Sequence, residues 1–159
     1  MIDGLSSLES VKVGNRCFRA GNGVCRITNC PNLLQLEIGD DSFADFKSVE
    51  LSNLNSLQSI NFGNYCFEHV RELVIDGLES LESVKIGNRC FRAGNGVCQI
   101  RNCPNLRQLE IGNWSFEYFK SFEISNVNSL QSINFGNWCF YYVEDFSLKS
   151  EWKERVKEM

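Results

Sequence analysis

Short runs in which apolar and polar residues alternate recur along the whole chain. Residues 34–38 read Leu-Gln-Leu-Glu-Ile, and residues 49–51 read Val-Glu-Leu. A period of two predicts short strands that turn one face to a core. Gly-Asn or Gly-Asp pairs follow one set of runs and asparagines such as Asn29 and Asn53 follow the other, as expected for tight corners. The pattern predicts a mostly-β fold.

The runs belong to a tandem repeat of the form L-x-x-(V/I/L)-x-(I/V/F)-G-(N/D)-x-(C/S)-F, a variable turn, and an apolar-x-apolar pair. Six copies follow one another at steps of 24 or 25 residues, starting at Leu8, Leu33, Leu57, Leu81, Leu106 and Leu130. Two strands and two corners in this length make one coil of a solenoid. A single coil buries too little to fold alone, so we expect stacked coils to share a core that includes the six repeat phenylalanines.

A longer period lies above this one. Residues 3–72 and 76–145 differ at only 17 of 70 aligned positions. The chain therefore consists of two 73-residue units of three repeats, starting near residues 3 and 76, which indicates a recent or engineered duplication. We expect one solenoid domain over residues 1–149, with short parallel strands on two faces.

The repeat resembles the BspA-like leucine-rich repeats. The resemblance rests on residues 38–43, Ile-Gly-Asp-Asp-Ser-Phe, with their five copies, and on Cys-Pro-Asn-Leu at residues 30–33 and 103–106. It implies a right-handed, weakly curved solenoid that binds proteins or surfaces, often as a segment of a larger protein. The family carries no catalytic residues.

The two ends of the solenoid differ in sequence. Residues 150–159 space Trp152, Val156 and Met159 at helical intervals after Ser150, a favourable N-cap. We expect a capping helix here that covers the last coil. At the other end the chain begins inside a strand, since Met1 and Ile2 align with Val74 and Ile75.

An uncovered strand edge is a template for association. Either further repeats precede this strand in a longer protein, or the open edge pairs with something. For the second case we hypothesise a homodimer that forms through this N-terminal edge. The edge residues proposed for self-association are Leu5, Leu8, Val11 and Val13.

Composition narrows the classes of partner. Sixteen basic and 20 acidic side chains give a net charge of −4, which argues against non-specific nucleic-acid binding. No run of apolar residues is long enough to span a membrane, and residues 1–4 have no signal-peptide character. Along one outward row Lys12 is expected to pair with Glu37 and Lys85 with Glu110.

The eight cysteines fill core positions of the repeat. Cys17, Cys66, Cys90 and Cys139 share a slot with Ser42 and Ser115. Without a C-x-x-C pair no metal site is expected. Cys66 and Cys90 lie in adjacent coils within reach of a disulfide, but we expect free buried thiols. Free thiols and the lack of a leader favour an intracellular location without fixing it.

Neither acid–base nor nucleophilic chemistry is indicated. His69 lies three residues after Cys66, yet it belongs to a variable turn while Cys66 belongs to the core slot. Asp40 and Asp41 occupy a corner. We expect no catalytic residues and no cofactor.

Variation between the copies gathers in the turns around each repeat phenylalanine, which we expect to face outward. In the second half these positions become aromatic. The candidate ligand-binding residues are Tyr65, Trp114, Tyr118, Trp138, Tyr141 and Tyr142. An exposed aromatic patch marks a binding site, unless Tyr141 and Tyr142 pack under the C-terminal cap.

The leading expectation is a non-enzymatic scaffold that presents variable turn residues to an unidentified protein, as a fragment or engineered piece of a longer repeat protein. The alternative is a cell-surface adhesion or glycan-binding module, whose aromatics would stack on sugars. A β-helical carbohydrate-active enzyme needs clustered carboxylates, whereas the outward rows alternate in sign.

Overall fold

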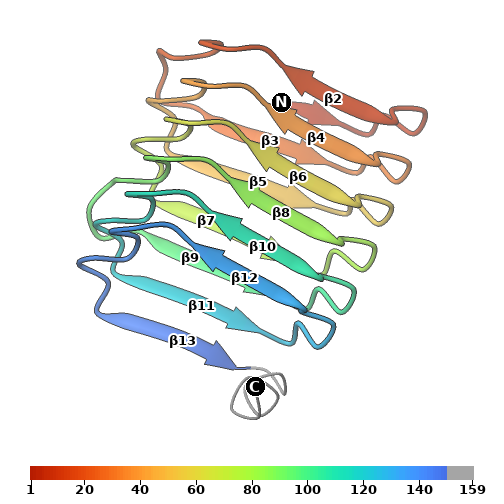
Figure 1. The fold of residues 1–159 in the computed structure, drawn as a ribbon. Coiled ribbons are helices and arrows are strands. Elements are labelled where there is room, and N and C mark those ends of the chain that lie inside the picture. The colour runs from red at the N-terminus through yellow and green to blue at the C-terminus, as the bar shows by residue number, and fades with distance from the viewer. Residues whose placement is uncertain (150–159) are drawn as a thin grey trace.

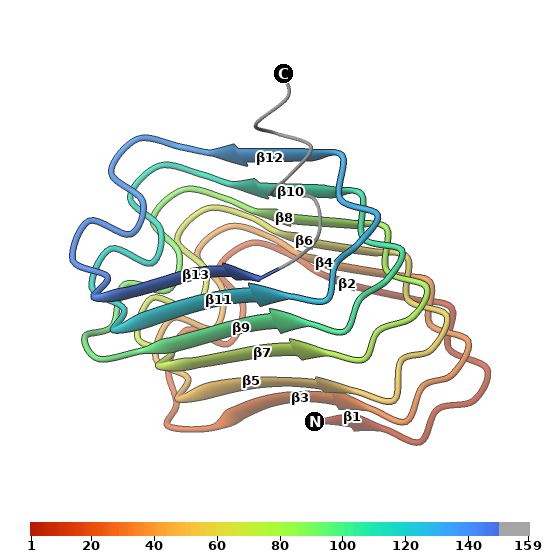
Figure 2. The ribbon, with the colours of Figure 1, turned by 90° about the horizontal axis from the view of Figure 1, so that it is seen from below.

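The computed structural model describes residues 1–149, which form a stack of six coils of short strands without any helix (Figure 1). Each of the six coils contributes one strand to each of two parallel sheets that face each other across the core, and Ile2–Asp3 adds a seventh strand to one of them (Figure 2). The predicted capping helix over residues 150–159 lies outside the described residues. The mostly-β solenoid of six coils is confirmed.

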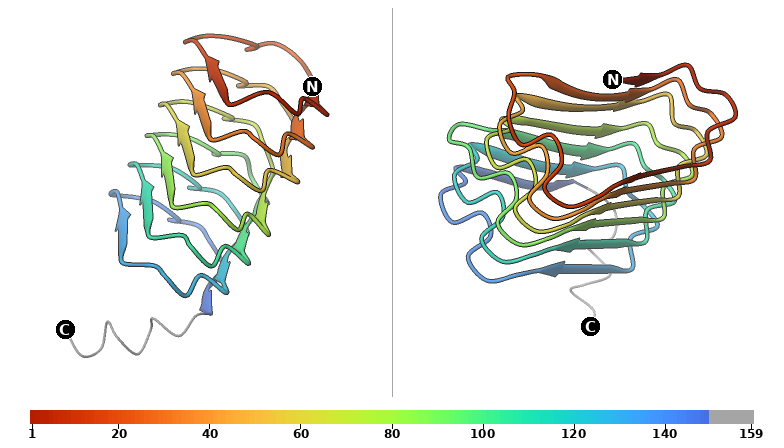
Figure 3. Two further views of the ribbon diagram at one scale, coloured as in Figure 1. Left: turned by 90° about the vertical axis from the view of Figure 1, so that its right-hand side faces the viewer. Right: turned by 90° about the horizontal axis from the view of Figure 1, so that it is seen from above.

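The seven-stranded sheet has the order β1 (Ile2–Asp3), β3 (Val24–Thr28), β5 (Ser48–Ser52), β7 (Glu72–Asp76), β9 (Val97–Arg101), β11 (Ser121–Ser125), β13 (Asp145–Lys149). The six-stranded sheet has the order β2 (Ser10–Val13), β4 (Gln35–Ile38), β6 (Ser59–Phe62), β8 (Ser83–Ile86), β10 (Gln108–Ile111), β12 (Ser132–Phe135). Each strand pairs with the equivalent strand of the next coil, so the coils rise as regular steps (Figure 3).

Identical positions of successive coils stack in the core. The rings of Phe43, Phe67, Phe91 and Phe116 form a column with centroids 5.3, 5.3 and 5.0 Å apart, and all four are buried. The expectation that all six repeat phenylalanines are buried is wrong at the N-terminal end, where Phe18 is 61% exposed. The end coils have a neighbour on one side only, so their core residues lack half of their cover.

Side-chain ladders run along both corners. At the first corner each coil's Asn or Asp accepts a backbone hydrogen bond from the next coil, such as Asn64 N to Asp40 Oδ1 at 2.7 Å. At the second corner asparagines bond one another: Asn53 Nδ2 donates to Asn29 Oδ1 at 2.7 Å. The corner asparagines therefore form a ladder along the solenoid, which at the second corner links side chains rather than bonding the backbone.

Glycine at the first corner serves close approach rather than an unusual backbone angle. Gly87 does not have a positive φ, but a Cβ added to it would lie 2.6 Å from the carbonyl carbon of Gly63. Left-handed angles occur instead two residues later and at the repeat phenylalanine, as at Arg89 (φ 56°) and Phe91 (φ 54°). The backbone of one coil therefore rests directly on that of the next.

Opposite charges meet along the outward row of the six-stranded sheet, as predicted. Lys12 Nζ lies 3.0 Å from Glu37 Oε2, and Lys85 Nζ lies 3.6 Å from Glu110 Oε2. Each of these exposed pairs contributes about 0.2–1 kcal/mol at most. In each unit, the first and second coils are therefore linked by one exposed Lys–Glu pair.

Candidate aromatic binding surface

Five of the six predicted binding residues gather in one cluster on the turns of the last two coils. We call this set the aromatic cluster: Trp114, Tyr118, Trp138, Tyr141 and Tyr142. Trp114 stacks on Trp138 with ring centroids 5.3 Å apart, and Tyr118 stacks on Tyr142 at 5.1 Å. Tyr141 joins the two stacks, at 5.2 Å from Trp138 and 4.7 Å from Tyr142.

The cluster is open to solvent over most of its rings. Trp138, Tyr141 and Tyr142 are 51%, 57% and 56% exposed. Trp114 is less exposed than these three residues, because Trp138 of the next coil covers one face of its ring. Exposed aromatic area of this extent is uncommon on a surface that contacts only water.

Tyr65, the sixth predicted residue, lies apart from the cluster. It occupies the same corner position as Trp114 and Trp138, but Arg89 stands between them in the row of coils. The guanidinium carbon of Arg89 lies 5.6 Å from the centre of the Tyr65 ring, a cation–π contact.

An arginine–glutamate pair supports the edge of the aromatic cluster. Arg92 donates from Nε and Nη2 to Glu117 Oε2 at 3.0 and 2.7 Å, and its guanidinium lies 5.9 Å from the centre of the Tyr118 ring. The Glu117 carboxylate, as hydrogen-bond partner and as a negative charge, raises the pKa of Tyr118. The shift favours the neutral phenol of Tyr118.

Two turn residues expected to face outward are buried. Ala44 is 7% exposed and Glu117 is 5% exposed. The carboxylate tolerates this burial because Arg92 of the preceding coil pairs with it. Both residues belong to the variable turns around the repeat phenylalanines. The spacing of 25 residues between Arg92 and Glu117, one coil, is the sequence signal that relates this pair.

The same row of turns is charged in the first four coils. A depression of about 740 Å³ is lined there by Arg16, Arg19, Asp41, Tyr65, Glu68 and Arg92, among others. Asp41 lies 3.2 Å from Arg19 and 3.8 Å from Arg16. The turn surface thus changes along the solenoid from paired charges to aromatic rings.

Part of the difference between the two units lies at this surface. Five of the 17 positions at which the units differ are the five residues of the aromatic cluster. Their counterparts in the first unit are Asp41, Asp45, Tyr65, Glu68 and His69. One backbone therefore carries two different surfaces at equivalent turns.

The two residues considered for nucleophilic catalysis, Cys66 and His69, lie in different environments. Cys66 is fully buried, and a hydrogen bond with Cys90 lowers the pKa of Cys66. His69 is exposed and lies 3.7 Å from Asp45. All eight cysteines are free, and burial raises the pKa of Cys25 and of Cys103 to about 11. These thiols are packing groups.

The four proposed self-association residues differ in exposure. Leu5 is 49% exposed, Leu8 and Val13 are half-buried, and Val11 is already 8% exposed within the core. The edge of β2 beside them has no strand paired on its outer side in the part of the chain that the structure describes.

A comparison with known protein families, with curated proteins and with solved structures finds no match for this chain. Within residues 1–149 no helix is long and apolar enough to cross a membrane. The same residues contain no group of three or more His, Cys, Asp or Glu side chains placed to hold a metal ion.

Proposed function

We propose that this protein is a non-enzymatic scaffold that binds another protein through the aromatic cluster. The observation that carries the proposal is the comparison of the two units: five turn positions that hold Asp, Asp, Tyr, Glu and His in the first unit all hold aromatic residues in the second, where the five rings contact one another. Aromatic rings that replace charged residues at one exposed surface, and that contact one another there, are typical of a recognition site.

The energetics of association favour such a surface. Tyrosine, tryptophan and arginine are the residues that dominate protein interfaces, and truncation of one such anchor costs about 2 kcal/mol or more, roughly a 30-fold loss of affinity. The rings of the aromatic cluster already hold each other in place, and Arg92 holds Tyr118. Binding therefore orders few side chains, which lowers its entropic cost.

A protein partner fits the arrangement better than a glycan. A sugar ring binds against an open aromatic face, whereas the faces in the aromatic cluster pack on one another, Trp114 on Trp138 and Tyr118 on Tyr142. The surface left open consists of ring edges, hydroxyl groups and the outermost faces. Such a mixed surface suits the apolar and polar side chains of a protein interface.

We also propose that the repeat is of the BspA-like leucine-rich type and winds with a right hand. Repeats of 24 or 25 residues, the I-G-x-x-(small)-F step and the leucines at 0% exposure, such as Leu57 and Leu81, support this assignment. Crossovers between parallel strands are right-handed in about 98% of cases.

The first unit supplies the variant that tests the proposed function. The five residues of the aromatic cluster are replaced by their counterparts, giving Trp114→Asp, Tyr118→Asp, Trp138→Tyr, Tyr141→Glu and Tyr142→His. Every introduced residue already occupies the same turn of the same repeat, so the fold is expected to persist. Affinity capture with the wild type and with this variant, read by quantitative mass spectrometry, compares the proteins bound by each.

We expect at least one protein to be retained by the wild type and to fall at least about 30-fold in affinity for the variant. The matched control is Leu34→Arg, which places the second unit's residue on an exposed site away from the aromatic cluster. A partner that binds the wild type and the five-residue variant equally well would refute the proposal. Retention of glycans in place of proteins would support the adhesion alternative.

A further inference from the structure

The two ends of the solenoid expose core positions that the interior covers. Phe18 and Phe91 occupy the same place in the two units, yet Phe18 is 61% exposed and Phe91 is fully buried. At the opposite end Phe135 is 37% exposed, while its counterpart Phe62 is 1% exposed. The cover that the interior residues have and the end residues lack is one neighbouring coil.

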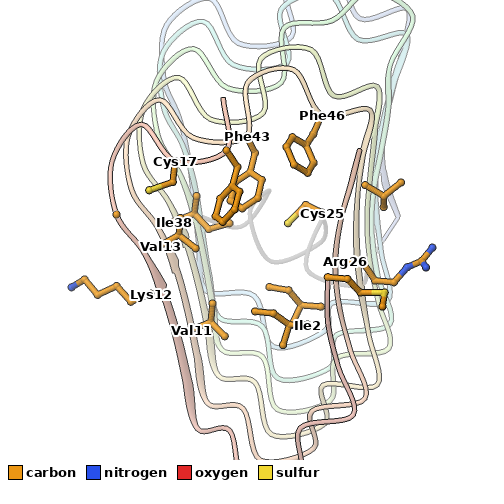
Figure 4. A pocket seen from close by; sticks show the side chains of 15 residues that line it. Ile2, Val11, Lys12, Val13, Cys17, Cys25, Arg26, Ile38, Phe43 and Phe46 are labelled. Atoms are coloured by element: carbon orange, nitrogen blue, oxygen red, sulfur yellow. The ribbon is translucent and has the colours of Figure 1, made fainter. Parts of the chain in front are cut away.

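At the N-terminal end this missing cover leaves an apolar hollow of about 450 Å³. Figure 4 shows it between the two sheets, with Ile2, Val13, Cys17, Cys25, Phe43 and Phe46 around it. β1 reaches only two residues along β3, pairing Ile2 with Ile27 and Asp3 with Thr28, so it leaves the rest of the hollow open.

The C-terminal end presents a complementary set of aromatic rings. Phe135, Phe140 and Phe146 contact one another with centroids 5.0–6.0 Å apart. Phe146 is 43% exposed, whereas Leu73 at the same place in the first unit is fully buried. Three core rings therefore lie at one end, and an apolar hollow lies at the other.

The contact between the third and fourth coils shows how two such ends can pack. We call the contact between two stacked coils a joint. The third coil stacks on the fourth, where β6 pairs with β8 in the register Ser59–Ser83, Ile60–Val84, Asn61–Lys85 and Phe62–Ile86. The sixth coil repeats the third and the first repeats the fourth. Pairing β12 with β2 of another copy would align Ser132 with Ser10, Ile133 with Val11, Asn134 with Lys12 and Phe135 with Val13.

We propose that copies of this chain stack head to tail, the sixth coil of one on the first coil of the next. Phe18 then lies against Phe135 and Phe140, as Phe91 lies 6.1 Å from Phe62 and 5.3 Å from Phe67 within the chain. Within the paired strands of the six-stranded sheet, only the Ile86 position differs between the two joints, where the first unit has Val13. A heterologous contact of this kind builds open linear assemblies.

The seven-stranded sheet requires an exchange of strands at the same joint. β13 of one copy and β1 of the next copy would occupy the same place beside β3 of that next copy. This follows because Leu148 and Ile2 both correspond to Ile75. β13 has five residues, as does β7, which pairs with β9 over its full length. The longer β13 displaces the two-residue β1 and places Phe146 in the hollow.

Charge and side-chain direction disfavour a head-to-head dimer through β2. Antiparallel pairing of two β2 strands over their full length aligns Val11 with Lys12 of the partner. Residues directly opposite in a sheet share a face, so this register turns Lys12 toward the core. Head-to-tail stacking instead places Asn134 beside Lys12, as Asn61 lies beside Lys85.

Two variants that each block one end distinguish these assemblies. Phe18→Asp blocks the N-terminal end and Phe135→Asp blocks the C-terminal end. Analytical ultracentrifugation should show the wild type rising above the 18.2 kDa of one chain with concentration, and each variant alone staying at that mass. An equimolar mixture should form a 1:1 complex of twice the mass, because each variant keeps the end that the other has lost.

Leu34→Asp, at an exposed leucine away from both ends, is the control and should assemble like the wild type. If circular dichroism shows that either blocking variant is unfolded, Val13→Lys and Phe146→Asp replace the pair. Self-association of Phe135→Asp alone would indicate the head-to-head dimer and overturn the proposal. A wild type that stays monomeric at every concentration would also overturn the proposal.

Discussion

At the scale of single residues, the glycine of the first corner sets how closely the coils stack. A Cβ on Gly87 would lie 2.6 Å from both the carbonyl carbon and the carbonyl oxygen of Gly63. Because these are backbone atoms, the coils have to separate to make room. We expect Gly87→Ala to lower the free energy of unfolding by about 1–3 kcal/mol, measured by urea denaturation.

Gly94→Ala is the matched control for this prediction. Gly94 has no positive φ, and a Cβ added to it meets nothing within 4 Å. Alanine there restricts the unfolded chain and should leave stability unchanged or raise it by about 0.4–1 kcal/mol. Equal losses at Gly87 and Gly94 would contradict the explanation by close approach.

The sequence located these glycines but did not reveal their role. Gly-Asn pairs are typical of residues with unusual backbone angles, and here the unusual angles lie at Arg89, Phe91 and their equivalents. Arginine, tryptophan and phenylalanine have no preference for a left-handed backbone, so their residue types give no signal of it. Stacking of six coils imposes the angle, and stacking is a property of the tertiary structure.

At the scale of the strands and their corners, Asp76 links the end of β7 to the next coil. Arg101 Nε donates to Asp76 Oδ2 at 2.9 Å, and Asn102 Nδ2 donates to Asp76 Oδ1 at 2.8 Å. Partial burial acts to raise the pKa of Asp76, but these hydrogen bonds outweigh it and the net pKa is lowered. The folded state therefore favours the ionised carboxylate.

A lowered pKa in the folded state gives a pH dependence of defined sign. The contribution of Asp76 is present above the pKa of an unfolded aspartate, about 3.9, and is lost as the pH falls through the lower folded value. We expect Asp76→Asn to be less stable than the wild type by about 0.2–1 kcal/mol at neutral pH, with the gap narrowing below pH 4. Urea denaturation at several pH values measures this gap.

The substitution Arg101→Thr introduces the residue that the first unit has at the same place, Thr28. It removes the guanidinium, so this variant should lose part of the same pH dependence of stability. A gap between wild type and Asp76→Asn that stays constant from neutral to acidic pH would show that Asp76 acts without its charge.

Strands and turns were not equally predictable. Alternation such as Val49-Glu50-Leu51 falls inside β5, with the two apolar residues buried. The turns were predicted only as variable and exposed, and this failed for Glu117, whose burial depends on Arg92 one coil away. The alternation within a strand's own sequence predicts which of its side chains are buried. The burial of a turn residue such as Glu117 depends on a partner from another coil.

For the whole molecule, the duplication made the position of the aromatic cluster predictable but not its internal packing. Trp114 and Trp138 stand one coil apart in a row that the repeat defines, so their proximity follows from the sequence. That Tyr141 bridges the two stacks depends on side-chain directions in the turns.

Because each coil contacts only its neighbours, local stability should fall from the middle of the solenoid toward its ends. The interior strands β6 and β8 have a paired strand on both sides, while β2 and β12 have one. In dilute solution we expect hydrogen exchange to be slowest in β6 and β8 and fastest in β2 and β12. Uniform protection along the chain would contradict a coil-by-coil stability.

Concentration dependence then connects this gradient to the proposed stacking. If the sixth coil of one copy covers the first coil of the next, protection of β2 and β12 rises together with concentration, while β6 and β8 stay constant. A head-to-head dimer would protect β2 and leave β12 unchanged. The protection of β2 and the protection of β12 are therefore separate measurements of the same contact between molecules. Only an increase in both agrees with an assembly that continues the internal repeat from one molecule into the next.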